Sequence, residues 1–121
     1  MPIFHEQLGS VPTDSERLFR AIGEGVLPGD CANLHENVIV AGARIPLHQH
    51  AVEEVIVCLA GTGQCSFNGG PPEDYGAGSV LIIPPGTPHS IVNTGSGLLR
   101  QLAFFPSDRQ TLWIEPAGSV R

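Results

Sequence analysis

Two histidines and a glutamate lie close together in the middle of the 121-residue chain. His48 and His50 are separated by one residue, and Glu54 follows four residues after His50. Alternate side chains of an extended segment point to the same face, so we expect all three to converge on one side of a strand. Burying two imidazoles and a carboxylate without a cation is costly. The spacing therefore predicts a site for one divalent transition metal ion, with Fe, Mn, Ni, Zn, Co and Cu all suited to these ligands.

A further histidine can complete this site from another part of the chain. His89 follows residues 84–88, a turn stiffened by three prolines and opened by a glycine. Strand-like sequence leads into the turn and leaves it, so we predict a hairpin that delivers His89 as the fourth ligand. Glu54 is also the predicted catalytic residue, because a carboxylate whose bond to the metal loosens can accept a proton.

The segments around these residues have the composition of short β-strands. The chain contains 15 glycines and 11 prolines, which divide it into runs rich in Val, Ile, Leu and Phe. Short strands at regular spacing favour an all-β sandwich or barrel. We interpret residues 59–63 as a hairpin turn, 68–74 as a loop, and 108–115 as either a last strand or a short helix. The predicted strands are 17–22, 35–41, 53–60, 64–67, 79–83, 90–93 and 98–105.

The glycines, histidines and prolines together resemble the two motifs of the cupin superfamily. The motifs G-x5-H-x-H-x3-4-E-x6-G and G-x5-P-x-G-x2-H-x3-N are both matched without a gap. The resemblance covers residues 42–93. It implies a single cupin domain over residues 1–121, folded as an antiparallel jelly-roll β-barrel that holds a metal with three histidines and one glutamate. The matching residues are Gly42, His48, His50, Glu54 and Gly61 in the first motif, and Gly78, Pro84, Gly86, His89 and Asn93 in the second.

A metal with four protein ligands keeps about two coordination positions open for substrate, oxygen or water. We therefore expect a metal-dependent enzyme on a small organic substrate, either a dioxygenase or a redox-neutral lyase, isomerase or cyclase. The alternative is a non-catalytic small-molecule-binding or sensor module, because a fold does not settle a function.

Strand parity predicts an apolar substrate pocket around the metal, although the same residues can simply be barrel core. Cupins that degrade oxalate tend to carry Arg or Asn three residues before the first ligand. This chain has Ile45 there, so oxalate chemistry ranks low. Phe105 is an alternative to Phe104, and Cys65 shares the parity of the set. The predicted pocket residues are Ile45, Ile56, Cys58, Phe67 and Phe104.

The composition limits the classes of partner. Twelve acidic residues against six basic ones give a net charge of −6, which repels phosphate backbones, so we expect no nucleic-acid partner. No apolar run is long enough to cross a membrane and no secretory signal is present, so we expect no membrane partner and a cytoplasmic location with reduced thiols. Sheet edges that need cover predict a homodimer, with the N-terminal strands in residues 1–34 at its interface.

Five residues outside the motifs receive structural interpretations. His5 and His35 are expected at the surface or as capping residues. Arg44 and Arg100 are expected to pair on the surface, with the anchoring of a substrate carboxylate as the alternative. Trp113 is expected either in the core or at an interface.

Overall fold

The computed structural model describes residues 11–12, 15–23 and 33–118, and all regular elements in these segments are strands. His5 lies outside the described residues, as does much of the predicted interface region 1–34. The predicted strands are all present, and two more occur at 44–49 and 73–76. The strands are β1 (Arg17–Ala21), β2 (Leu34–Ile39), β3 (Arg44–Gln49), β4 (Glu54–Ala60), β5 (Thr62–Phe67), β6 (Glu73–Gly76), β7 (Val80–Ile83), β8 (His89–Asn93), β9 (Leu99–Phe104) and β10 (Leu112–Trp113).

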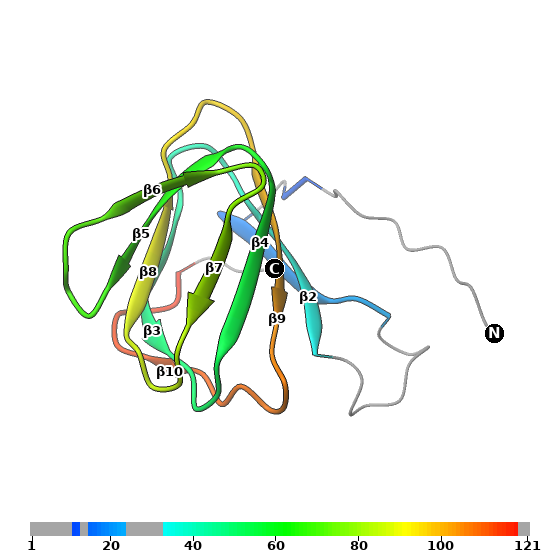
Figure 1. Cartoon of the computed structure of the whole chain (residues 1–121). Coiled ribbons are helices and arrows are strands. Elements are labelled where there is room, and N and C mark those ends of the chain that lie inside the picture. The colour runs from blue at the N-terminus through cyan, green and yellow to red at the C-terminus, as the bar shows by residue number, and fades with distance from the viewer. Residues whose placement is uncertain (1–10, 13–14, 24–32, 119–121) are drawn as a thin grey trace.

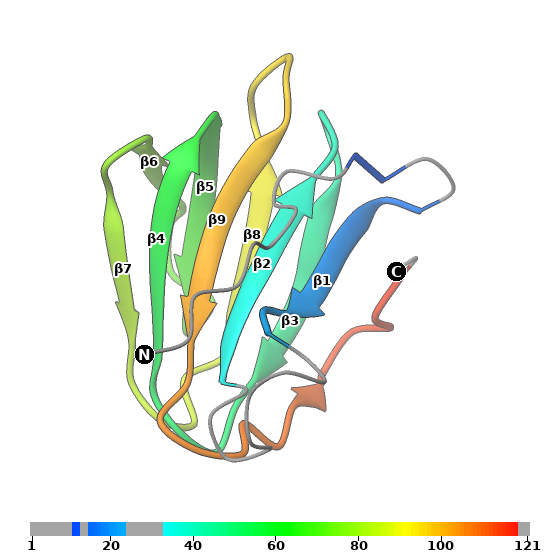
Figure 2. The same ribbon diagram turned by 90° about the vertical axis from the view of Figure 1, so that its right-hand side faces the viewer.

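The strands form two antiparallel five-stranded sheets. One sheet has the order β1-β2-β9-β4-β7 and the other β10-β3-β8-β5-β6. Figure 2 shows the first sheet as a front layer with β3, β8, β5 and β6 behind it. Most consecutive strands are not neighbours in a sheet, as in a jelly roll. The predicted all-β jelly-roll fold is therefore confirmed.

Two predicted hairpins are corners between the sheets. β4 belongs to the first sheet and β5 to the second, so the glycine-rich turn at 59–63 carries the chain from one sheet to the other. The proline-rich turn at 84–88 does the same between β7 and β8, as Figure 1 shows. The hairpin interpretation was wrong because a sharp turn has the same glycine and proline signal whether the strands pair or diverge.

The prediction that Glu54 shares a strand with the two histidines was also wrong. β3 ends at Gln49, the chain bends over residues 51–52, and Glu54 begins β4 in the other sheet. A β-bulge between Ile45 and His48 changes the register of β3 against β8. The bulge lets Ile45 and His48, which have opposite parity, be buried together.

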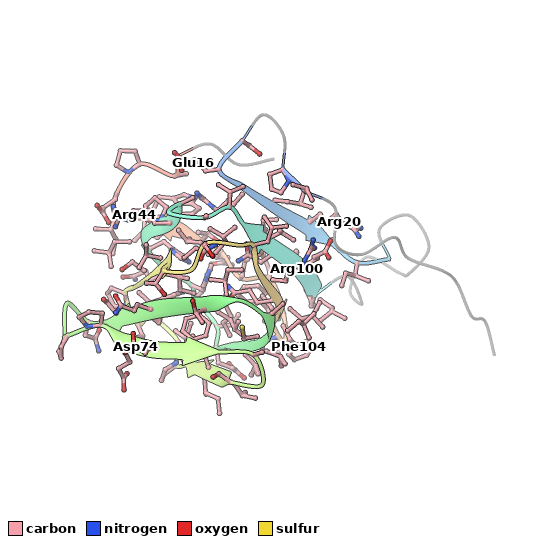
Figure 3. The ribbon with its side chains drawn as sticks, turned by 90° about the horizontal axis from the view of Figure 1, so that it is seen from above. Glu16, Arg20, Arg44, Asp74, Arg100 and Phe104 are labelled. Carbon is pink, nitrogen blue, oxygen red and sulfur yellow. The ribbon has the colours of Figure 1, made fainter. Side chains whose placement is uncertain are left out.

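The hydrophobic core lies between the two sheets. Alternate residues of β4 are buried, and those between them are turned outward, with Val57 and Leu59 36% and 50% exposed. Phe104 on β9 is 48% exposed and lies at the periphery in the view from above, on the opposite side from Arg44 (Figure 3). Among the described residues no helix has the length and apolar character that a membrane crossing requires. The single-domain assignment and the homodimer stay predictions.

Cys58 and Cys65 are both buried and both free, as expected of reduced thiols. They lie on strands of different sheets, β4 and β5. Asn93, the last residue of the second motif, is buried and forms hydrogen bonds. Its amide donates to the carbonyl oxygens of Ile39 and Gly97 at 3.0 and 2.8 Å.

Gly61 is the position where the β4–β5 corner tolerates substitution least. Its φ is +89°, and a Cβ atom there would lie 2.5 Å from the carbonyl oxygen of Leu98. We expect Gly61→Ala to lower the free energy of unfolding by about 2–4 kcal/mol, combining left-handed strain with a steric clash. Gly42→Ala is the matched control, because Gly42 has a φ of +76° but no atom within 4 Å of its Cβ position. Equal losses in urea denaturation would contradict the role of the close approach.

Candidate metal centre

The four predicted ligands converge at one place between the sheets. His48 lies on β3, His50 follows its last residue, Glu54 opens β4 and His89 opens β8. Their ligand atoms all lie within 4.8 Å of one another, and none of the four residues is more than 6% exposed. The carboxylate Oε1 of Glu54 is 3.2 Å from Nε2 of His89 and 3.5 Å from Nε2 of His50. Each ligand therefore comes from a strand end or from the residue beside one.

The outer nitrogen of each imidazole is already occupied by a hydrogen bond. Nδ1 of His48 lies 2.7 Å from the carbonyl oxygen of Pro46, and Nδ1 of His89 lies 2.9 Å from that of Thr87. A carbonyl only accepts, so Nδ1 carries the proton and Nε2 keeps its lone pair. Nδ1 of His50 is 3.0 Å from the hydroxyl oxygen of Thr111, a group that is able to accept in the same way. This arrangement orients histidines as metal ligands.

The electrostatics of the cluster keep it ready for a cation. Burial, with the neighbouring His89, lowers the pKa of His48 to about 4, so its imidazole is neutral at pH 7. Without a metal, burial raises the pKa of Glu54, but hydrogen bonds from His50 and His89, donated when their Nε2 atoms carry a proton, outweigh it and lower that pKa to about 2. A bound cation would take the place of these protons. The result is an ionised carboxylate and imidazole lone pairs at one buried point. This donor set fits a transition metal ion, for which metal–nitrogen and metal–oxygen bonds are about 2.0–2.2 Å.

A cavity of about 400 Å³ opens onto the four ligands. This volume is within the range of small-molecule sites. Apolar side chains form one part of its wall, and two arginines, an asparagine and a threonine form another. The lining residues are Arg17, Phe19, Asn37, Ile45, His48, His50, Glu54, Ile56, His89, Ile91, Arg109, Thr111, Trp113, Ala117 and Gly118.

Only some of the predicted pocket residues line the cavity in the structure. Ile45 and Ile56 line the cavity, whereas Cys58 is buried but does not line it. Phe67 lines a separate hollow beside β6 and β7. The placement of Phe104 inside was wrong, because inward and outward positions alternate along β9 and Phe104 falls on the outer face. Its neighbour Phe105, the alternative, is 1% exposed and packs edge-on against His50 with ring centroids 4.9 Å apart.

The C-terminal segment supplies cavity residues that the sequence analysis missed. Arg109, Thr111 and Trp113 have the same parity and all line the cavity. β10 lies beside β3 and pairs with it (Figure 1). The pairing places Trp113 opposite His48, and their ring centroids are 4.8 Å apart. In an extended segment, alternate residues such as 109, 111 and 113 point to the same side. The sequence left residues 108–115 as either a strand or a short helix, so this alternation could not be used to predict the cavity wall.

The N-terminal side of the cavity corrects the interpretation of His35. His35 is 6% exposed and stacks on Phe19 with ring centroids 4.6 Å apart, so it is neither a surface nor a capping residue. Arg109 donates to Nε2 of His35 at 3.2 Å. Burial, with the nearby Arg109, lowers the pKa of His35 to about 4. By contrast, Arg44 pairs at the surface with Glu115 at 2.9 Å, as expected.

The lowered pKa values predict how the stability of the metal-free protein depends on pH. His35 and His48 titrate near 4 when folded and near 6.5 when unfolded. Between these values the unfolded chain binds more protons, so we expect stability to rise with pH from about 4 to 6.5. Urea midpoints measured at pH 4.5 and 7 check this. His35→Gln should show a smaller difference between the two pH values, and an unchanged difference would contradict the assignment.

The part of the chain that holds the four candidate ligands is similar to known proteins. The family model for the cupin domain matches residues 36–105, which include all four ligands. The dimethylsulfoniopropionate lyase DddQ from Ruegeria pomeroyi is 33% identical over 85 residues, which are 69% of this chain and 42% of the relative. The crystal structure of DddQ superposes with a TM-score of 0.61 at 29% identity, over 70% of this chain and 44% of that one.

Two further structures show similar folds. A structure of oxalate oxidase has a TM-score of 0.75 at 18% identity, over 92% of this chain and 63% of that one. A structure from Thermotoga maritima described as a predicted oxalate decarboxylase has a TM-score of 0.56 at 33% identity, over 60% and 63% of the two chains. The chain spans less than half the length of its curated relative DddQ, at 42%. The match of the family model over more than half of its residues shows that the chain belongs to the cupin family.

Proposed function

We propose that the protein is a metal-dependent enzyme of the lyase type, acting on a small organic substrate that bears a carboxylate. The observation that carries this proposal is the ligand set His48, His50, Glu54 and His89 in the wall of a cavity of about 400 Å³. Similarity to a dimethylsulfoniopropionate lyase supports the choice of a lyase over a dioxygenase. One ion of Fe, Mn, Ni, Zn, Co or Cu suits the ligands.

His48, His50, Glu54 and His89 would hold the metal ion, which would supply Lewis-acid polarisation of a substrate oxygen and so acidify the neighbouring C–H group. Glu54 is the one carboxylate among the described residues that line the cavity, so it is the group available to take that proton. The electrons of the C–H bond form a new double bond, and the bond to the leaving group breaks with its electron pair. Glu54 then returns the proton to water, and no oxidant is consumed.

The apolar wall has a separate task in this reaction. Ile45, Ile56 and Ile91 line the cavity beside the ligands and are at most 7% exposed. They hold the carbon skeleton of the substrate and keep water from the leaving group. The apolar side chain of Ile45 offers no hydrogen bond to oxalate from this position of the wall, which is the reason that we do not expect oxalate as the substrate.

Metal analysis and turnover test the proposal together. We expect protein purified anaerobically without an affinity tag to hold a transition metal, and to eliminate a leaving group from a β-substituted carboxylate without oxygen. His50→Ala should lose the metal, and Glu54→Gln should lose turnover. Elemental analysis and proton NMR of the reaction measure both.

Glu53→Gln is the matched control for Glu54→Gln, because Glu53 is an exposed neighbour with the same charge. Turnover that requires oxygen would show a dioxygenase instead. Retained metal with binding but no turnover of any candidate would show the non-catalytic module. Elimination that survives Glu54→Gln would remove Glu54 as the proton acceptor.

Thr111 provides a second test, since its hydroxyl is the one side-chain group among the Nδ1 partners of the ligands. We expect Thr111→Val to weaken metal affinity about 10- to 100-fold, because His50 loses the bond that orients it. Thr87→Val is the control, because Thr87 holds His89 through its backbone carbonyl, which the substitution keeps. Competition with a metal-binding dye measures the affinities. Equal affinities of the two variants would contradict the orienting role.

A further inference from the structure

Arg109 and Arg17 line the same cavity as the metal ligands. Arg17 is 2% exposed and donates to the carbonyl oxygens of Arg44 and Ala117, so its guanidinium is largely engaged by the protein. Arg109 donates through Nε to Thr111 and through one terminal nitrogen to His35, both at 3.2 Å. In the described part of the chain no carboxylate forms an ion pair with Arg109. Its charge is therefore left for a ligand.

The aromatic rings of the cavity are engaged by the same two arginines. The guanidinium of Arg17 lies over Trp113 at 5.4 Å, and that of Arg109 lies over Phe19 at 4.8 Å. Phe19 is also stacked against His35. Aromatic faces recognise cationic ligands, but here a ligand cation would compete with the protein's own cations. Two arginines, one carboxylate and a divalent ion also make the cavity strongly positive, which favours anions.

We propose that the cavity selects a small dianion, with one anionic group at the metal and the second on Arg109. The inference rests on the proposed function, because it takes the metal as the first attachment point. An arginine binds a carboxylate through charge-assisted hydrogen bonds, which are stronger than neutral ones. Arg109 is thereby a specificity-determining residue.

The dianion must be long enough to reach from the metal position to Arg109. The Thr111 hydroxyl contacts both His50 and Arg109, 3.0 Å from Nδ1 of the first and 3.2 Å from Nε of the second. Nε2 of His50, across the ring from Nδ1, is the atom that would hold the metal. The two carboxylates of oxalate are bonded directly to each other, so we expect oxalate to reach the metal position without also reaching Arg109. A dicarboxylate with a carbon chain between its ends can reach both.

An unpartnered atom in the same wall also points to a ligand. Asn37 lies on β2, is 3% exposed and lines the cavity, yet its Oδ1 has no hydrogen-bond partner. Buried polar atoms are almost always satisfied, so this oxygen needs a donor. A hydroxyl group on the ligand, or a water bound with it, supplies that donor.

Binding of succinate, propionate and oxalate to zinc-loaded protein tests the inference. Zinc has no redox chemistry, so binding is measured by calorimetry without turnover. We expect succinate to bind about 10- to 100-fold more tightly than propionate, since the second carboxylate adds a charge-assisted bond. Oxalate can chelate the zinc through both carboxylates, so its binding should not depend on Arg109. In Arg109→Gln the advantage of succinate over propionate should disappear. The side-chain Nε signal of Arg109 in NMR spectra of the wild type should shift with succinate and not with propionate.

Arg100→Gln is the matched control. It removes the same charge from a residue that does not line the cavity and whose NH1 has no hydrogen-bond partner. It should keep the preference for succinate. Equal binding of succinate and propionate, or a preference that persists in Arg109→Gln, would overturn the inference. The zinc content of each sample is measured first. Absence of zinc from the wild type overturns the metal site and the inference together, whereas zinc without the preference overturns the inference alone.

Discussion

Four groups that can accept hydrogen bonds lie together in the buried space between the sheets. Bringing them together is electrostatically unfavourable, and the surrounding structure holds them in place. The Nε2 atoms of three imidazoles and the carboxylate of Glu54 lie within 4.8 Å of one another, in residues that are almost inaccessible to water. Lone pairs brought together in this way repel unless a proton or a metal cation lies between them. The protein fixes the imidazoles from behind, through two backbone carbonyls and the hydroxyl of Thr111. These hydrogen bonds orient the imidazoles toward the candidate metal position without any contribution from a metal.

The jelly roll provides the positions because its two sheets meet at this site. The histidines come from β3 and β8 or the residue after β3, whereas Glu54 opens β4 in the other sheet. A metal ion bound by all four residues thus links the two sheets near the corners where the chain crosses between them. Binding of the ion stabilises the folded state by mass action, because the unfolded chain does not hold the ligands together.

The ligands and the fold class could be predicted from the sequence, but the path of the chain at the corners could not. Spacing and residue type identify His48, His50, Glu54 and His89, and the glycines divide the strands. The glycine-rich turn before β5 has the same local signal in a hairpin and in a corner. Phe104 and Phe105 are adjacent at the end of β9. Whichever of the two alternating sides faces inward, one phenylalanine is buried, so the sequence does not indicate which one. Only pairing between distant strands decides such cases.

The unpredicted half of the cavity depends on contacts between residues far apart in the sequence. The segment that carries Arg109, Thr111 and Trp113 is tied to β3 and the following bend. The amide of Ala51 donates to the carbonyl of Arg109 at 2.9 Å, and that of Ile114 to Leu47 at 3.0 Å. Figure 2 shows the chain after β10 turning back toward β1, where Arg17 holds the carbonyl of Ala117. Arg17, Arg109, Thr111 and Trp113 lie outside the two motifs that supply the candidate metal ligands. Arg17 and Arg109 form the charged wall without belonging to the four candidate ligands. We therefore expect substitutions of these two arginines to change which small molecule is accepted more than they change the candidate metal site, in contrast to substitutions of Thr111, whose hydroxyl contacts His50.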